Sequence, residues 1–182
     1  MLFVDGENLT HEAEKIAEER NMPLKQGAYY SPGTFIWMQG IRPRDARFVQ
    51  GVLDIQLNAV RAHYYTSVVG SEETMAQIEN ALWAIGFHPE VFHKQKGHRS
   101  KGVDITLASD VLSHAFQDNY DVAFLVAGDG DYVPLVEHIK RLGKIVYLAF
   151  FLEPSLNLKL KLACDMFFDL QHAFDASNGW PQ

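Results

Sequence analysis

Short apolar runs alternate along the chain with longer segments in which apolar residues recur every three or four positions. The runs are rich in β-branched and aromatic residues, which favours β-strands, and some have no polar face, as expected inside a parallel sheet. The longer segments have the spacing of amphipathic helices. The predicted strands are Leu2–Asp5, Ala59–Val69, Glu90–His93, Asp121–Val126, Ile145–Phe151 and Met166–Asp169.

The helices are indicated by this spacing and by residues that favour helix ends. The clearest has apolar residues at helical positions from Met75 to Ile85, with Ser71 as its N-cap and Gly86 just beyond its end. The other predicted helices are His11–Arg20, Arg44–Leu53, Val103–Ala115, Tyr132–Leu142 and Ser155–Cys164.

This alternation predicts one α/β domain over residues 1–182, folded as a three-layer α/β/α sandwich with a mostly parallel central sheet. Residues 21–43 interrupt the pattern, because they are rich in Gly, Pro and aromatic residues and predict an irregular excursion. Its aromatic side chains could stack on nucleic-acid bases or form a small core of their own. These side chains are Tyr29, Tyr30, Phe35 and Trp37.

The composition, with 47% hydrophobic and 21% charged residues, is that of an ordinary globular chain. No apolar run reaches the roughly 18 residues that cross a membrane, and the first strand is not preceded by the basic region of a secretory signal. The single cysteine, Cys164, excludes an internal disulfide and fits a reducing compartment, so we expect a cytoplasmic protein. The net charge of −7 argues against non-specific nucleic-acid binding.

Three separated segments each carry a candidate carboxylate. Asp5 ends the first strand, and Asp129 and Asp131 lie at the turn after the strand Asp121–Val126. Ligands of open α/β sheets bind beyond the carboxyl ends of the strands, which is where these residues lie. Asp104 starts a later helix. Gathered carboxylates repel one another unless a cation joins them, and hard oxygen ligands favour Mg²⁺ or Mn²⁺. We therefore predict that all four carboxylates bind one of these metals.

Most of these candidates also have a structural alternative. Asp5 could be a turn residue or a helix cap, and Asp104 could simply be favoured by the dipole of its helix. Asp131 could be only the N-cap of the helix that follows, whereas Asp129 has no comparable structural role. Asn8 could cap the first helix, beginning near residue 9, and still contact a metal-bound water or a phosphate.

Two further acidic residues are predicted to lie outside the metal site. Glu7 is expected to face solvent in the first turn of its helix. Asp110 follows Asp104 by six positions, which is about 240° around a helix, so the two carboxylates cannot point the same way. We interpret Asp110 as a supporting or structural carboxylate.

A short basic loop in this acidic chain directly precedes Asp104. It could be an ordinary solvated loop, or it could neutralise phosphates beside the carboxylates. The sequence contains no zinc-type HxxxH or HExxH spacing, no GxSxG motif and no Walker A loop. The predicted phosphate-binding residues are Lys94, Lys96, Arg99 and Lys101.

Taken together, these motifs resemble the NYN domain, in its LabA-like branch within the PIN-like nuclease superfamily. The resemblance rests on Phe3–Asn8, Lys101–Asp110 and Asp121–Leu135, with Leu142–Val146 and the segment Leu160–Leu170 in family order. It implies a PIN-like fold of Rossmann-like topology and an acidic pocket for Mg²⁺ or Mn²⁺. Carried over by motif position, Asp5, Asn8, Asp104, Asp129 and Asp131 would be the catalytic residues.

The resemblance implies a metal-dependent endoribonuclease that hydrolyses single-stranded RNA. The main alternative is a non-catalytic regulatory module that binds RNA or a protein and retains the acidic pocket. A third alternative is a phosphatase or nuclease that acts on DNA or small nucleotides, although the chain lacks the Asp-x-Asp-x-Thr pattern of one large phosphatase class. A homodimer or a protein partner is compatible with the sequence, which contains no feature that decides it.

Overall fold

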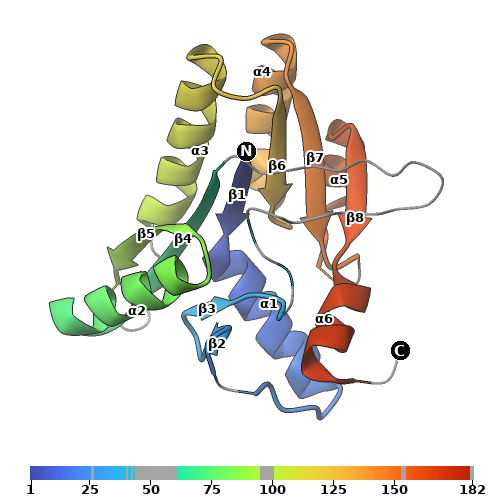
Figure 1. Cartoon of the computed structure of the whole chain (residues 1–182). Coiled ribbons are helices and arrows are strands. Elements are labelled where there is room, and N and C mark those ends of the chain that lie inside the picture. The colour runs from blue at the N-terminus through green and yellow to red at the C-terminus, as the bar shows by residue number, and fades with distance from the viewer. Residues whose placement is uncertain are drawn as a thin grey trace.

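The computed structural model describes residues 1–25, 27–39, 41, 43, 61–94, 101–152 and 155–180, with Lys101 described in its backbone alone (Figure 1). The helix predicted over Arg44–Leu53 therefore lies outside the described residues. So do two of the predicted phosphate-binding residues, Lys96 and Arg99.

A six-stranded parallel sheet forms the centre of the domain, with strand order β5-β4-β1-β6-β7-β8. Strand β1 lies between β4 and β6. Strands β4 and β5 are added on one side of β1, and the later strands β6, β7 and β8 are added on its other side. The predicted strands are confirmed, with small changes at their ends. Their bounds are β1 Leu2–Asp5, β4 Ala62–Val68, β5 His88–His93, β6 Val122–Val126, β7 Ile145–Phe150 and β8 Met166–Asp169.

Helices cover both faces of this sheet, as the three-layer prediction requires (Figure 1). On one face, α1, α2 and α6 pack in one apolar cluster, and on the other α3, α4 and α5 pack in a second cluster. The helices are α1 Gly6–Glu19, α2 Glu72–Ala84, α3 Lys101–Phe116, α4 Val133–Arg141, α5 Leu158–Ala163 and α6 Gln171–Asn178, with a 3-10 turn η1 at Gly130–Tyr132 before α4.

The period of two along β1 decides where its last side chain points. Leu2 and Val4 belong to the cluster under α1, whereas Phe3 belongs to the cluster under α3. Because successive side chains of a strand point to opposite faces, Asp5 lies on the same face as Phe3. The alternation of apolar residues in the first strand therefore directs the Asp5 carboxylate toward α3 and η1.

Three local features differ from the expectations. Helix α1 begins at Gly6, with Asp5 rather than Asn8 as its N-cap, because the Asp5 side chain accepts a hydrogen bond from the Asn8 amide. Helix α5 begins three residues later than predicted, because Asn157 caps it. Helix α6 was not predicted at all, since its apolar face is provided mainly by Phe174.

The excursion expected over residues 21–43 contains a small antiparallel hairpin, β2 Tyr30–Ser31 and β3 Phe35–Ile36. This hairpin is held over the sheet by Tyr64, whose hydroxyl group donates to the Ile36 carbonyl and accepts from the Ile36 amide. Phe35 and Trp37 are each 2% exposed and belong to the main core. Two of the four aromatic side chains of this segment therefore join the main core, and they do not form the separate small core that one of the alternatives predicted.

Within the described residues, no helix is long and apolar enough to cross a membrane.

A half-buried histidine of β4, His63, lies near the end of the sheet opposite to Asp5. The His63 ring stacks against Phe3 and His88, and its Nε2 atom is buried with no hydrogen-bond partner among the described residues. Burial, followed by the neighbouring His88 and His114, lowers the pKa of His63 to about 4, and Arg61 adds to this while Asp110 opposes it. The folded protein therefore keeps this ring neutral in mildly acidic solution.

We expect His63 to make the free energy of unfolding depend on pH. An unfolded histidine titrates near 6.5, so the unfolded chain takes up this proton first and stability falls as the pH drops from about 6.5 to about 4. Solvent partly screens the ring, so we expect a loss of about 1 kcal/mol. Urea unfolding at pH 7 and pH 5 should show a smaller loss for His63→Phe than for wild type or the exposed control His11→Gln. Equal losses in all three proteins would contradict the assignment.

Candidate functional site

The centre of the candidate site is the Asp5 carboxylate, which is 3% exposed at the carboxyl end of β1. Its Oδ1 accepts a hydrogen bond of 2.9 Å from the Asn8 amide, and its Oδ2 accepts one of 2.9 Å from the Tyr132 hydroxyl group. Burial raises the pKa of Asp5 to about 7, the two donors lower it, and the charges of Asp104 and Glu7 raise it further. At neutral pH this carboxyl is therefore balanced between its charged and neutral forms.

Asp104 lies in the first turn of α3 and shares a hydrogen-bond donor with Asp5. The Tyr132 hydroxyl group lies 2.9 Å from Asp5 Oδ2 and 3.2 Å from Asp104 Oδ1. Partial burial raises the pKa of Asp104, the Tyr132 hydroxyl opposes this, and the charges of Asp129, Glu7 and Asp131 add to it. Asp104 therefore lies within electrostatic range of the other three predicted carboxylates.

Asp129 and Asp131 lie on the exposed loop between β6 and α4. The expectation that only Asp131 has a capping role is wrong, because Asp129 is the N-cap of η1 and its Oδ1 accepts a hydrogen bond of 3.0 Å from the Asp131 amide. The sequence pattern favoured Asp131 because it precedes the regular helix, but the 3-10 turn moves the cap two residues earlier.

Asn8 joins the loops that follow the two central strands. Its Oδ1 accepts a hydrogen bond of 2.7 Å from the Gly128 amide, which belongs to the loop after β6. A side chain at position 128 would collide with Phe150, since an added Cβ would lie 2.3 Å from that ring. Asn8 therefore fixes the Gly128–Asp131 loop beside Asp5, and the loop needs glycine to pack this closely.

Glu7 is a member of the site that the sequence reasoning missed. Instead of facing solvent, it accepts hydrogen bonds of 2.9 Å from the Ser67 hydroxyl and 2.8 Å from the Lys94 ammonium group. Its charge also raises the pKa of both Asp5 and Asp104. In the sequence, the only sign of this role is that Glu7 follows Asp5 by two residues. The helical turn after β1 brings both residues to the carboxyl edge of the sheet.

Lys94 is the one predicted phosphate-binding residue whose side chain is described. It lies directly after β5 and is paired with Glu7, so its charge is at the edge of the carboxylate group but is already balanced. Asp110 lies apart from that group: its Oδ2 accepts a hydrogen bond of 2.9 Å from Tyr65, and it acts electrostatically on Glu90, His63 and His114.

The chemistry of these donors fits a hard divalent cation. A buried carboxylate needs a positive partner, and among the described residues Asp5 meets two hydrogen-bond donors and no cationic side chain. The ligand set is not complete as the side chains stand, because no three His, Cys, Asp or Glu side chains of the described part are arranged to hold a metal ion. Asp129 and Asp131 are exposed, and their charges raise the pKa of Asp104.

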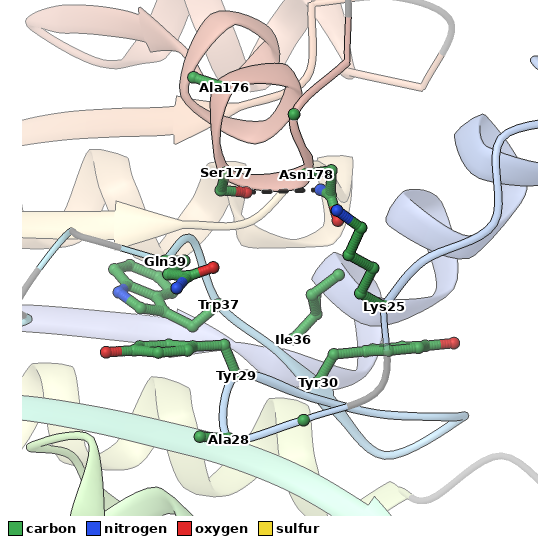
Figure 2. Close-up of a pocket in the computed structure, with 12 residues that line it drawn as sticks. Lys25, Ala28, Tyr29, Tyr30, Ile36, Trp37, Gln39, Ala176, Ser177 and Asn178 are labelled. Carbon is green, nitrogen blue, oxygen red and sulfur yellow. Dashed lines mark hydrogen bonds between the residues drawn. The ribbon is translucent and has the colours of Figure 1, made fainter.

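A separate cavity of about 460 Å³ lies between the β2–β3 hairpin and α6 (Figure 2). Figure 2 shows the Tyr29 and Tyr30 rings along one side of this cavity, and Ser177 and Asn178 on the opposite side. The Tyr30 hydroxyl group donates to Glu14 of α1. Tyr29 and Tyr30 are therefore the two aromatic residues of the excursion that remain partly exposed, whereas Phe35 and Trp37 are buried.

A parallel α/β sandwich with grouped carboxylates at the carboxyl edge of its central strands is the arrangement of a PIN-like domain. The family model for the NYN domain matches residues 1–171. The chain therefore belongs to the NYN domain family, within the PIN-like nuclease superfamily.

The chain is similar to the crystal structure of a protein of unknown function from Vibrio parahaemolyticus, with 27% sequence identity over 63% of this chain and 71% of that chain, and a TM-score of 0.48. No curated protein matches the chain.

We expect Asp5→Asn to stabilise the protein when no divalent cation is present. The folded carboxyl keeps its proton up to about pH 7, whereas an unfolded aspartate loses it near pH 4, so ionised Asp5 destabilises the folded state at pH 8. An amide avoids this cost and can still accept from Asn8. In EDTA at pH 8, the gain in the free energy of unfolding should be about 2–4 kcal/mol and should disappear near pH 4.

Urea unfolding in EDTA measures this difference. Asp131→Asn is the matched control, because that carboxylate is exposed and its removal should change stability by less than about 0.5 kcal/mol. If Asp5→Asn is less stable than wild type at pH 8, the ionised Asp5 carboxylate does not destabilise the folded state and the prediction is wrong.

Proposed function

We propose that this chain is a metal-dependent endoribonuclease of the LabA-like branch, which hydrolyses phosphodiester bonds of single-stranded RNA. The observation that supports it most directly is the buried Asp5 carboxylate, joined to Asp104 through one hydroxyl group at the carboxyl edge of the sheet. Membership of the NYN family supports the same reaction class. A cytoplasmic location, where RNA is present and cysteines stay reduced, is part of the proposal.

The carboxylates would hold Mg²⁺ or Mn²⁺, with Asp5 and Asp104 as the inner ligands and Asp129 and Asp131 on the exposed side. Such a cation, when bound, activates water and stabilises negative charge on the phosphate. Asn8 holds the loop of Asp129 against the end of β1. The buried side of the site excludes water from Asp5, which strengthens its interaction with a cation.

The basic loop would bind phosphates that flank the cleaved bond. Lys94 already pairs with Glu7, so an RNA phosphate would compete with that carboxylate for the same ammonium group. Lys96, Arg99 and Lys101 complete the proposed set. Because the whole chain has a net charge of −7, RNA contact would be confined to this local basic segment.

A second candidate function is a non-catalytic module that binds RNA or a protein partner. Two observations favour it: the described residues hold no complete group of metal ligands, and the Asp129 carboxylate is used as a helix cap. This function predicts binding without turnover.

Two carboxylates on the same helix provide a matched test of cleavage. Asp104→Asn should lower the rate of RNA cleavage at least about 100-fold, because it removes an inner ligand. Asp110→Asn should stay within about three-fold of wild type, since Asp110 bonds Tyr65 away from the other carboxylates. The assay uses labelled single-stranded RNA with Mn²⁺, Mg²⁺ or EDTA, and Asp129→Asn serves as a third variant.

Cleavage that needs the metal, survives Asp110→Asn and is lost in Asp104→Asn would support the nuclease. RNA that is bound but uncleaved under every condition would favour the binding module. Preferential cleavage of DNA or nucleotides in a competition assay would show that the substrate is DNA or a small nucleotide and not RNA. Full cleavage by Asp104→Asn and Asp129→Asn would overturn the proposed site.

We also expect RNA binding to depend on salt through the basic loop. Each phosphate contact that is lost should lower the slope of log affinity against log salt concentration by about 0.7. Lys96→Gln and Arg99→Gln should each show this loss, whereas Lys140→Gln, whose charge is paired with Asp165, should not. Filter binding in EDTA at several salt concentrations measures the slope, and unchanged slopes in both loop variants would exclude the loop from RNA contact.

A further inference from the structure

One hydroxyl group connects two carboxylates that come from distant parts of the chain. Tyr132 lies in η1, 127 residues after Asp5, and its oxygen is within hydrogen-bond distance of both Asp5 Oδ2 and Asp104 Oδ1. The two carboxylate oxygens therefore cannot lie farther apart than these two contacts allow.

The hydroxyl group offsets a repulsion that would otherwise separate the two side chains. The charge of Asp104 raises the pKa of Asp5, so the two carboxylates repel each other when both are charged, and no cationic side chain of the described residues touches Asp5. A hydrogen bond to a carboxylate is strong when the acceptor is charged and the surroundings are dry. The single hydrogen of the Tyr132 hydroxyl group can be donated to either carboxylate or shared between the two, from one fixed point.

Tyr132 is held rigidly enough to define this point. Its side chain is 4% exposed and packs in the apolar cluster of α3, α4 and α5. The turn that carries it is capped by Asp129 and is followed at once by α4. The ring therefore cannot follow Asp104 if that exposed side chain moves toward solvent.

The contact leaves carboxylate oxygens available for a cation. Asp104 Oδ2 has no hydrogen-bond partner among the described residues, and an oxygen that accepts one hydrogen bond keeps a second lone pair. Oxygens that share one Mg²⁺ lie about 2.0–2.1 Å from it, so its ligands must be close together before it binds tightly. Holding two carboxylates together in advance lowers the cost of collecting them.

We propose that Tyr132 is a positioning residue that uses its hydroxyl group to hold Asp5 and Asp104 together for a divalent cation. The inference rests on the proposed function, because it assigns a role within the same carboxylate site. Tyr132 acts through the two carboxylates and does not touch the substrate. Asp129 and Asp131 then complete the site from the exposed side.

The test measures cation binding without RNA. Purified wild type, Tyr132→Phe, Tyr120→Phe and Asp5→Asn are titrated with Mn²⁺, and the free ion is followed by its paramagnetic resonance signal. Tyr120 is the matched control, because it is a buried tyrosine of the same cluster whose hydroxyl donates to the Val111 carbonyl at 3.0 Å. Thermal unfolding in EDTA verifies that each variant is folded.

Tyr132→Phe should bind Mn²⁺ at least about five-fold more weakly than wild type, while Tyr120→Phe should stay within two-fold. A double-mutant cycle adds a second measurement: in an Asp104→Asn background, Tyr132→Phe should have little further effect, because the hydroxyl then has one carboxylate left to hold. A merely structural role would lower the affinity equally in both backgrounds.

The outcomes separate this inference from the proposed function. Equal or tighter Mn²⁺ binding by Tyr132→Phe, with wild type binding normally, overturns the positioning role alone. Wild type that takes up no Mn²⁺ overturns the proposed cation site and this inference together. Weaker binding by Tyr120→Phe to the same extent as Tyr132→Phe would assign the effect to the core and overturn the inference as well.

Discussion

Removing a carboxylate from water costs several kcal/mol unless a charge or hydrogen-bond donors compensate, and this chain buries Asp5 at the end of its central strand. Groups at the carboxyl edge of the sheet offset part of that cost by donating hydrogen bonds to Asp5. The first turn of α1 provides the Asn8 amide, and η1 provides the Tyr132 hydroxyl group, which lies 127 residues after Asp5 in the sequence. Both donors reduce the penalty without removing it, so the position stays favourable for a positive ion.

The sheet topology explains why these groups meet. Strand β1 lies between β4 and β6, so the loops that follow all three strands open at the same edge. The loop after β1 carries Glu7 and Asn8, the end of β4 carries Ser67, and the loop after β6 carries the two exposed aspartates. Helix α3 then delivers Asp104 from the adjacent face. A parallel sheet thus gathers polar side chains that are far apart in sequence.

The strands could be predicted because their apolar content is a local signal. The position of Asp5 at the end of the first strand could be predicted for the same reason, because Asp5 interrupts an apolar run. Contacts that depend on tertiary structure could not be predicted in this way. Tyr132 fits a helical apolar pattern, which gives no sign of its hydroxyl bonds, and the Glu7–Lys94 pair spans 87 residues. Helix α6 is short and largely polar, so it depends on packing by Phe174 rather than on its own periodicity.

The bond between Asn8 and Gly128 spans 120 residues and has a consequence for the order in which the protein forms. During synthesis, the amino-terminal segment emerges long before the β6 loop that it must contact. The two loops can be joined only after β6 has paired beside β1, which makes this contact a late, non-local event. A nascent chain that ends before η1 therefore has the Asp5 sequence but no assembled site, and the carboxylates come together only when most of the sheet is complete.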